Sequence, residues 1–478
     1  MRIRRIQMTK KIILSGLVAS SLFAINLTAA STEDRIAALE KEIASLKSTS
    51  SEVGEISERL EKVETRTIVD RISLGLGMRV EMNNMSTTYA NGTSPVNEDP
   101  IFRTKFNINM KSDIADNLKF NGRLSSYKNW GDSNTDQMAM ASMDAKEGRT
   151  PDDSSALYVE RAYLDWSLNK GSEYPLALTI GRQPSSDGPS YQIKEGTTRK
   201  GTYDALAFDG AADGVVLTAN ISKVLPGTTS LRFAYGTPNN GSTYNSTYMA
   251  DTKVSGVFLD KTCSLISNDH LIQIYAVNAK DLMGNPNFGG DINTTNGINE
   301  GDKNVGDLGL YGAMFEIQNL GGFDFFAHYA HSNAKPNGRT INMGAYGNMG
   351  LLSSGGTSAD TAETTEKSGS AIWLGTQYSI ADWSVGAEYN KGSENWFSFT
   401  FSPNDPINKL AVRGTATELY VAKKINKYAN VRIGHVAIDY DYTGSGSWLG
   451  APMAISNPYA ATQVKEQTNT YLTLNVLF

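Results

Sequence analysis

Apolar and polar residues alternate with a period of two in many segments of this chain after about residue 70. In the last stretch, Leu472, Leu474, Val476 and Phe478 fall on one side of an extended chain, and Tyr471, Thr473 and Asn475 on the other. This period gives a β-strand one apolar face. At a free terminus such a strand would be an exposed edge, unless it pairs with the first strand and closes a barrel. A core strand of a soluble β-sandwich is the alternative.

The order of strands and connections favours the barrel. The short connections are 113–116, 169–175, 223–229, 263–269, 319–322, 380–382 and 425–429, and they alternate with long ones, as membrane barrels require. We therefore predict an all-β, antiparallel, up-and-down transmembrane barrel of about 16 strands, within a range of about 14–18, in residues 67–478. Both termini lie at the short-turn end. The predicted strands are 71–82, 101–112, 117–128, 157–168, 176–183, 214–222, 230–236, 253–262, 270–279, 308–318, 323–331, 370–379, 383–390, 415–424, 430–440 and 468–478.

The alternation also assigns the two faces of each strand. In segment 101–112, Phe102 and Phe106 point to lipid, whereas Arg103 and Lys105 point to the lumen. The same alternation directs three further basic side chains to the lumen from their own strands, namely Arg123, Arg161 and Arg232. An Arg or Lys that faces lipid at the midplane costs about 2–4 kcal/mol, so this consistent parity supports a membrane barrel.

A different period precedes the barrel. In residues 31–66, apolar residues recur at steps of three and four between charged residues. A short helix with one apolar stripe requires a partner, so we predict a trimeric coiled coil in the periplasm. A lone amphipathic helix packed on the barrel mouth or plugging it is the alternative. The predicted seam consists of Ile36, Leu39, Ile43, Leu46, Ile56, Leu60 and Val63.

Residues 1–30 have the features of an export signal. Arg2, Arg4, Arg5, Lys10 and Lys11 precede a mostly apolar stretch and the small residues Thr28–Ala30. We predict a signal peptide that is removed on export by the general secretory route, and a retained membrane helix is the alternative. Past this segment no apolar run reaches the roughly 18 residues that a transmembrane helix needs.

Composition narrows the chemistry. The net charge of −6, from 44 basic and 50 acidic residues, argues against a nucleic-acid partner. With one cysteine and four histidines, no disulfide, haem motif or metal cluster is evident, so we expect no cofactor and no metal. Residues 444–447 match a nucleophile motif only weakly, and spacing does not join His328, His331 or His435 to an Asp and a Ser. We expect no enzymatic activity.

Several motifs resemble a porin-like family of outer-membrane proteins whose domain has no assigned function. They lie at Tyr158–Trp166, Ile180–Pro189, Thr197–Tyr203, Asn395–Thr400 and Tyr442–Pro452. The Arg-Ala-Tyr and Gly-Arg-Gln runs are also similar to those of general diffusion porins, and the terminal Phe resembles the signal read by the barrel assembly machinery. The resemblance implies a channel in outer-membrane lipid of a Gram-negative bacterium, without implying its cargo.

In general porins the third external loop folds inward and narrows the pore, which here implies residues 184–213. Charged side chains of this loop would face basic side chains on the barrel wall, and such a transverse field screens solutes by charge. Arg182, where the loop begins, is our preferred constriction residue. The candidate selectivity residues are Arg103, Lys105, Arg123, Arg161, Arg182 and Arg232 on the wall, and Asp187, Glu195, Asp204 and Asp209 on the loop.

These observations predict a passive outer-membrane porin for small hydrophilic solutes or ions. The helix predicts that the protein forms a homotrimer. Two alternatives remain open at this stage. One is a structural or adhesive surface protein that uses its long loops. The other is a barrel that sheathes an electron-transfer partner, because this chain has no haem motif of its own.

Overall fold

The computed structural model describes Ile72–Phe478 except residues 95–99, 131–156, 200, 211, 226, 240–250, 264–268, 284–303, 339–350, 353–363, 401–403 and 446–449. Before Ile72 it describes residues 36, 37, 39–41, 43–45, 47 and 56. The region before Ile72 and the region from Ile72 to Phe478 are separate compact units.

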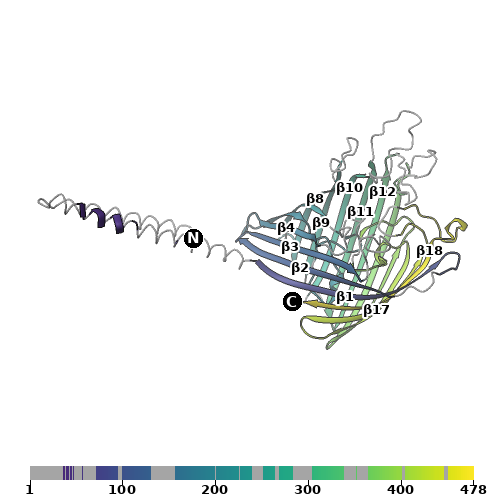
Figure 1. Cartoon of the computed structure of the whole chain (residues 1–478). Helices are drawn as coiled ribbons and strands as arrows, with labels where there is room; N and C mark the ends of the chain where they lie inside the picture. The colour runs from purple at the N-terminus through teal and green to yellow at the C-terminus, as the bar shows by residue number, and fades with distance from the viewer. Residues whose placement is uncertain are drawn as a thin grey trace. The chain divides into compact units, whose positions relative to one another are not determined.

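The larger unit is a closed antiparallel barrel of sixteen strands, as the sequence predicts (Figure 1). Each predicted strand corresponds to one barrel strand, most of them longer than predicted. The strands are β1 (Ile72–Tyr89), β2 (Ile101–Ala115), β3 (Leu118–Asn129), β4 (Tyr158–Ser167), β5 (Leu176–Arg182), β7 (Asp213–Asn220), β8 (Thr228–Asn239), β9 (Thr252–Cys263), β10 (Asp269–Met283), β11 (Asn304–Leu320), β12 (Phe323–Pro336), β13 (Lys367–Ile380), β14 (Trp383–Gly392), β16 (Gly414–Lys424), β17 (Ala429–Tyr440) and β18 (Val464–Leu477).

The first and last strands close the barrel. β1 pairs with β18 in a register that matches Gly77 with Leu477 and Asn83 with Tyr471. At the terminus, the Leu76 amide donates to the Phe478 carbonyl at 2.7 Å, and the Phe478 amide donates back at 2.9 Å. The predicted closure is therefore confirmed, and it leaves the apolar last strand with two neighbours instead of a free edge.

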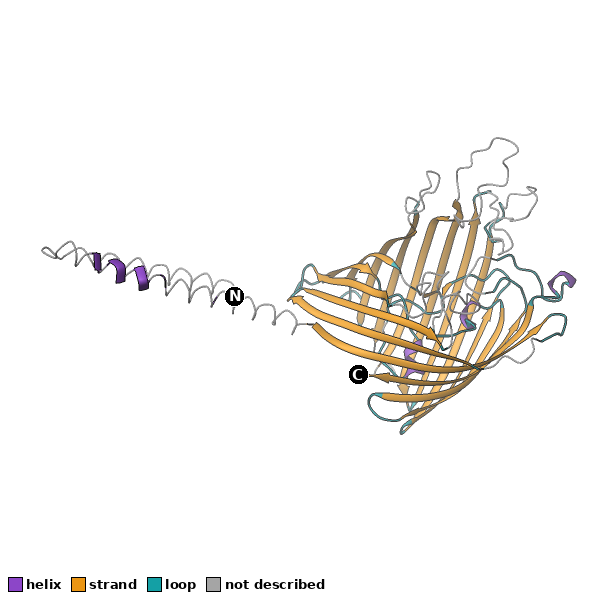
Figure 2. Cartoon of the chain, in the orientation of Figure 1, coloured by secondary structure: helices purple, strands orange, loops and turns teal. Residues whose placement is uncertain are grey.

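Short and long connections alternate around the barrel, as predicted. Two residues separate β2 from β3, β11 from β12, and β13 from β14, whereas the connections on the other side are longer (Figure 2). At the short-turn end, exposed aromatic side chains form a partial girdle, which is typical of membrane barrels. Its members include Trp166, Tyr174, Trp383, Tyr428 and Phe478.

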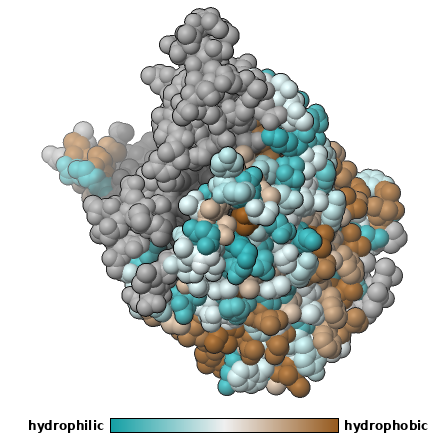
Figure 3. Space-filling view, turned by 90° about the vertical axis from the view of Figure 1, so that its right-hand side faces the viewer, coloured by the Kyte–Doolittle hydropathy of each residue, from teal (hydrophilic) through white to brown (hydrophobic). Residues whose placement is uncertain are grey.

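The outward face is apolar. Leu472 and Leu474 are 42% and 40% exposed, and Phe478 is 65% exposed. Seen from one side, hydrophobic residues gather along the lower and right-hand margins of the molecule and polar residues cover its middle (Figure 3). Arg103, Lys105, Arg123 and Arg161 are instead buried within the barrel, so the predicted parity of these strands is confirmed.

Two of the long loops turn into the lumen. Loop 183–212 carries α4 (Tyr191–Glu195) and β6 (Phe208–Asp209), and loop 393–413 carries β15 (Phe399–Thr400) and η4 (Lys409–Ala411). β6 and β15 pair in parallel, which ties the two loops together. The Thr400 hydroxyl contacts the carbonyl oxygens of Ala205 and Leu206 at 2.7 and 2.8 Å.

One side of the lumen is packed with apolar side chains, which we call the apolar wall. Leu206, Trp396 and Leu410 from the two loops are at most 1% exposed and belong to one cluster with this wall. A glycine on the wall makes room for a ring, because a Cβ at Gly375 would lie 2.1 Å from the Phe326 ring. The wall consists of Phe258 on β9, Tyr275 and Val277 on β10, Leu310 on β11, Phe326 on β12 and Trp373 on β13.

The smaller unit is helical at its described residues. Of the predicted seam, Ile36, Leu39, Ile43 and Ile56 lie on helix and are 52–60% exposed. Leu46, Leu60 and Val63 lie outside the described residues, so the coiled coil stays a prediction. In the part of the chain that the structure describes, no helix has both the length and the apolar composition to cross a membrane.

Candidate functional site

α4 spans the lumen between two unlike surfaces. Tyr191 and Ile193 are 8% and 4% exposed and pack into the apolar cluster. Lys194 and Glu195, at the end of the helix, reach the opposite side of the barrel. Gly196 ends the helix at a φ of 62°, a left-handed conformation that suits glycine. The loop therefore presents its charged end to one wall.

That opposite side, formed by β16–β18 and β1–β4, is charged, and we call it the charged wall. Its members on these strands are Arg79, Glu81, Arg103, Lys105, Arg123, Glu160, Arg161, Glu418 and Arg432. Barrel closure makes these strands continuous, since β18 pairs with both β17 and β1.

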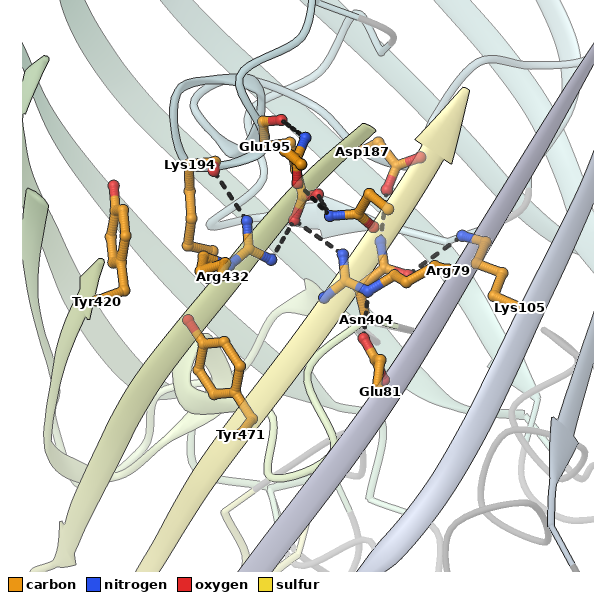
Figure 4. Close-up of polar contacts among 12 residues, drawn as sticks. Arg79, Glu81, Lys105, Asp187, Lys194, Glu195, Asn404, Tyr420, Arg432 and Tyr471 are labelled. Atoms are coloured by element: carbon orange, nitrogen blue, oxygen red, sulfur yellow. Dashed lines mark hydrogen bonds and ion pairs between the residues drawn. The ribbon is translucent and has the colours of Figure 1, made fainter. Parts of the chain in front are cut away.

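Glu195 is held by two arginines of the charged wall (Figure 4). One Glu195 carboxylate oxygen lies 2.8 Å from Arg79 Nη1 and 2.8 Å from Arg432 Nη2. Arg432 also donates to the Lys194 carbonyl at 2.8 Å, and the Asn475 amide reaches the second Glu195 oxygen at 3.3 Å. These charge-assisted contacts fix the end of α4 against β1, β17 and β18.

Asp187, at the start of the same loop, is held by two other arginines. Its Oδ2 atom lies 3.0 Å from Arg123 Nη1 and 3.6 Å from Arg161 Nη2. Arg123 also contacts Glu160 at 3.0 Å, and Arg161 donates to the Ser186 carbonyl at 2.6 Å. The first half of the inward loop is thus attached to the charged wall at two points, Asp187 and Glu195.

A third network joins loop 393–413 to the same wall. Lys409 Nζ lies 2.5 Å from Glu388 and also contacts Glu418, which lies 3.0 Å from Lys194 Nζ. Burial acts to lower the pKa of Lys409, but the neighbouring carboxylates raise it above its ordinary value. Burial raises the pKa of Asp405, a loop residue that accepts from the Ile407 and Lys409 amides.

Between α4 and the charged wall lies a polar pocket with a cavity volume of about 50 Å³. Basic, acidic and amide side chains line it, together with other residues of β1 and β18. The charged and amide members are Arg79, Lys105, Asn107, Asp187, Gln192, Glu195, Asn404 and Asn475. In the described residues, no group of three His, Cys, Asp or Glu side chains is arranged to hold a metal ion.

The structure brings six of the predicted site residues together. Arg103, Lys105, Arg123 and Arg161 lie on the charged wall, and Asp187 and Glu195 face it from the loop. Arg103 contacts Glu81 at 2.6 Å and thereby continues the network toward Arg79, which also contacts Glu81. The predicted juxtaposition of loop acids and wall bases is present for these residues.

The other four predicted residues lie elsewhere. Arg182 occupies the same side of β5 as Ile180, which is 41% exposed, and contacts Asp213 at 3.1 Å. The prediction that Arg182 is the constriction residue is therefore wrong, because strand parity directs it outward. Arg232 contacts Asp260 on the adjacent strand β9, apart from the other wall bases.

Asp204 and Asp209 do not line the pocket. Asp204 is fully buried, where it contacts His328 and accepts from the Tyr275 hydroxyl at 2.8 Å. Asp209 is 1% exposed and accepts from the Asp187 amide at 3.0 Å. Both carboxylates hold the loop in shape, because their hydrogen-bond partners lie within the protein interior.

A serine, a histidine and an aspartate meet at the apolar wall, which spacing did not reveal. His328 contacts Asp204 through Nδ1, and its Nε2 lies 3.1 Å from Ser190 Oγ. However, Ser190 is 1% exposed and donates to Glu316 at 2.7 Å. A nucleophile must reach its substrate, so this arrangement serves to anchor the loop.

Sequence reasoning missed several members of the site. Arg79, Glu81 and Arg432 occupy lumen positions of β1 and β17 that the same alternation would have identified. Glu160 escapes simple alternation, because a β-bulge between Arg123 and Leu124 turns both Glu160 and Arg161 inward. Trp396, Phe397 and Phe399 were a signal for the second inward loop, since solvated loops rarely carry three aromatic residues so close together.

Several solved structures of other proteins are similar to this chain. OmpT of Vibrio cholerae is 13% identical, with 85% of this chain and 97% of that chain covered and a TM-score of 0.45. Salmonella typhi OmpF in complex with daunomycin is 11% identical, with 86% and 98% covered and a TM-score of 0.46. Pseudomonas putida OprB is 11% identical, with 87% and 96% covered and a TM-score of 0.48.

No functionally curated protein matches the sequence. A family model described as protein of unknown function (DUF3373) matches residues 95–478, which is most of the barrel. This porin-like chain therefore belongs to the DUF3373 family, in agreement with the resemblance carried by its motifs.

Proposed function

We propose that this protein is a porin of the bacterial outer membrane that lets small hydrophilic solutes or ions diffuse passively. The observation that carries the proposal is the polar pocket between the inward loop and the charged wall, inside a closed barrel with an apolar outer face. A barrel of sixteen strands has an interior wide enough for an aqueous channel. Here the inward loops reduce that interior to a narrow polar passage.

The charges at the pocket give the passage its selectivity. Asp187 and Glu195 stand on the loop, and Arg79, Arg123 and Arg432 approach them from the wall within 2.8–3.0 Å. Charges that line one side of a narrow aqueous path produce a field across it, which orients water and discriminates solutes by charge and dipole. The inward loop 184–213 and the lumen basic residues set this field.

The same proposal places each part of the chain in the bacterial cell envelope. Residues 1–30 direct export, residues 31–66 form a periplasmic helix that trimerises, and residues 67–478 lie in the outer membrane. The terminal strand, with Leu472, Leu474, Val476 and Phe478 on one parity, is the part that the barrel assembly machinery recognises. Cross-linking of the protein in native membranes should yield covalent trimers. Recovery of monomer alone would contradict the trimer.

The two alternatives have less support. A sheath for an electron-transfer partner needs an open lumen, whereas loops 183–212 and 393–413 occupy much of this one. A purely structural or adhesive role does not explain a cluster of charged side chains around an internal polar pocket. Burial of charge costs free energy, so proteins retain such clusters where the charges act.

Planar-bilayer recording of the purified full-length protein tests the proposal. We expect discrete conductance steps, and a reversal potential that differs from zero when the salt concentrations on the two sides differ. Arg161→Glu and Arg103→Glu should each shift the permeability ratio toward cations. Lys119→Glu is the matched control, because Lys119 is 64% exposed on β3 near the short-turn end. The absence of conductance steps from a folded barrel would overturn the channel.

A further inference from the structure

Lys105 differs from the other basic side chains around the pocket. Arg79, Arg123, Arg161 and Arg432 each contact at least one carboxylate. Lys105 has no ion-pair partner among the described residues, although it is only 5% exposed and lines the pocket. Its ammonium donates to the side-chain amide oxygen of Asn404 at 3.2 Å and lies 4.8 Å above the Tyr127 ring. An ammonium has three donors, so it retains capacity for an anion.

Asn404 separates Lys105 from the nearest carboxylate of the loop. Its amide nitrogen donates to Asp187 Oδ1 at 2.9 Å, while its amide oxygen accepts from Lys105 (Figure 4). The two neighbours determine which way the amide points, since only the nitrogen can donate to a carboxylate. Asp187 is further occupied by Arg123 and Arg161. The lysine thus keeps its charge toward the pocket.

The charges of the charged wall and of the residues of loop 183–212 that contact it are unequal in number. Among the described residues, this set has seven basic and five acidic side chains, an excess of two positive charges. The basic members are Arg79, Arg103, Lys105, Arg123, Arg161, Lys194 and Arg432, and the acidic members are Glu81, Glu160, Asp187, Glu195 and Glu418. A narrow path within a positive excess concentrates anions and excludes cations.

We infer that Lys105 is the anion-binding residue of the pore, where chloride or a small carboxylate exchanges part of its hydration for the lysine ammonium. Asn404 is the positioning residue, because it holds the ammonium and keeps it from pairing with Asp187. The inference rests on the proposed channel function and specifies it as a preference for monovalent anions. Binding by a single ammonium next to amide groups is weak enough to let the anion leave again.

Reversal potentials in asymmetric 1 M and 0.1 M potassium chloride test the inference, with potassium acetate as a second arm. The wild type should prefer the anion in both salts. Lys105→Gln should lower the anion-to-cation permeability ratio about fivefold, the Boltzmann factor for a unit charge about 4 Å away in water. Asn404→Asp should lower it at least as far with almost no change of volume, because it gives Lys105 a carboxylate partner.

Lys111→Gln is the matched control for these variants. Lys111 lies on the same strand and the same parity as Lys105, but it is exposed and about 20 Å away along β2. Even on the 0.1 M side, salt screens charges beyond about 10 Å, so this control should keep the wild-type ratio. Heat-modifiable migration of each folded barrel on gels separates loss of folding from loss of selectivity.

Three results would contradict the anion site or the channel, and each has a different meaning. Conductance with an unchanged ratio in folded Lys105→Gln and Asn404→Asp would overturn the anion site and leave the channel standing. If the folded wild-type protein showed no conductance steps, the channel itself would be overturned. An equal effect of Lys111→Gln and Lys105→Gln would also overturn the site, since it would show a general effect of net charge.

Discussion

The inward loops contact two opposite walls of the barrel, one apolar and one charged. On the apolar wall, side chains such as Leu310 and Trp373 are 1% exposed, and their burial is the main source of stability. On the charged wall, ion pairs such as Arg432–Glu195 lose the hydration of both charges when they form, so they add little net stability. The apolar wall therefore holds the loops in place, and the charged wall supplies the field of the proposed channel.

Truncation of Trp373 on the apolar wall should have the largest effect on stability. Trp373 packs against Tyr191 and Phe326 and donates to Glu388 at 2.9 Å. Trp373→Ala should lower the free energy of unfolding by about 3–5 kcal/mol, because it removes a large buried ring and leaves a cavity. Denaturant unfolding of the refolded protein in detergent micelles measures this loss.

Trp383→Ala provides the control, since Trp383 lies next to the turn of the same β13–β14 hairpin and is 48% exposed. Its loss of unfolding free energy in micelles should be clearly smaller. Equal losses from both variants would contradict the view that the lumen packing, more than the outward belt, fixes the loops.

Neutralisation of Glu195 should have an intermediate effect on stability and a large one on the field. Glu195→Gln leaves Arg79 and Arg432 near each other without the carboxylate that joins them. We expect a loss of about 1–3 kcal/mol of unfolding free energy and a higher anion permeability. Glu173→Gln is the control, because the exposed pair of Glu173 and Lys223 contributes little. A stability loss without any shift of reversal potential would assign Glu195 a structural role alone.

The two walls also differ in how far sequence predicts them. Strand alternation gave the lumen position of Arg103, Lys105 and Arg123, because the membrane penalises charges on the outer face. It failed for Glu160, where a bulge changes the parity. The expectation for Arg182 rested instead on loop position and ignored strand parity, which places this residue on the outward side of β5. Register irregularities of this kind depend on the neighbouring strand, and so a single strand's sequence does not contain them.

Contacts that the inward loops make within the lumen were beyond prediction. Phe399 pairs with Phe208, and His328 meets Ser190 and Asp204, in each case across more than a hundred residues of sequence. No local period encodes such a contact, and it becomes visible only when the closed barrel brings the loops together. The barrel was predictable because its pattern is local and repeats sixteen times along the chain.

Asp405 offers a smaller effect that depends on pH. Burial raises the pKa of this carboxyl above its ordinary value of 3.8, with Lys409, Lys194 and Glu418 around it. The folded protein therefore binds this proton more tightly than the unfolded chain, so stability falls as pH rises from about 4 through the raised pKa. In Asp405→Asn this part of the slope should vanish. Identical pH slopes for the two proteins, measured by denaturant unfolding, would contradict the buried position of the carboxyl.

Substitution of Arg182 should have the smallest effect, and it tests whether the field belongs to the charged wall alone. Arg182 contacts Asp213 at the outward face of β5 and β7, and its side chain is 28% exposed. Arg182→Gln removes one positive charge from the protein, as Lys105→Gln does, but it removes the charge outside the lumen. The reversal potential should stay at its wild-type value, and the unfolding free energy should change by no more than about 1 kcal/mol. A shift comparable to that of Lys105→Gln would show that ion selectivity follows the total charge of the protein. The position of a charge on the charged wall would then have no effect on selectivity.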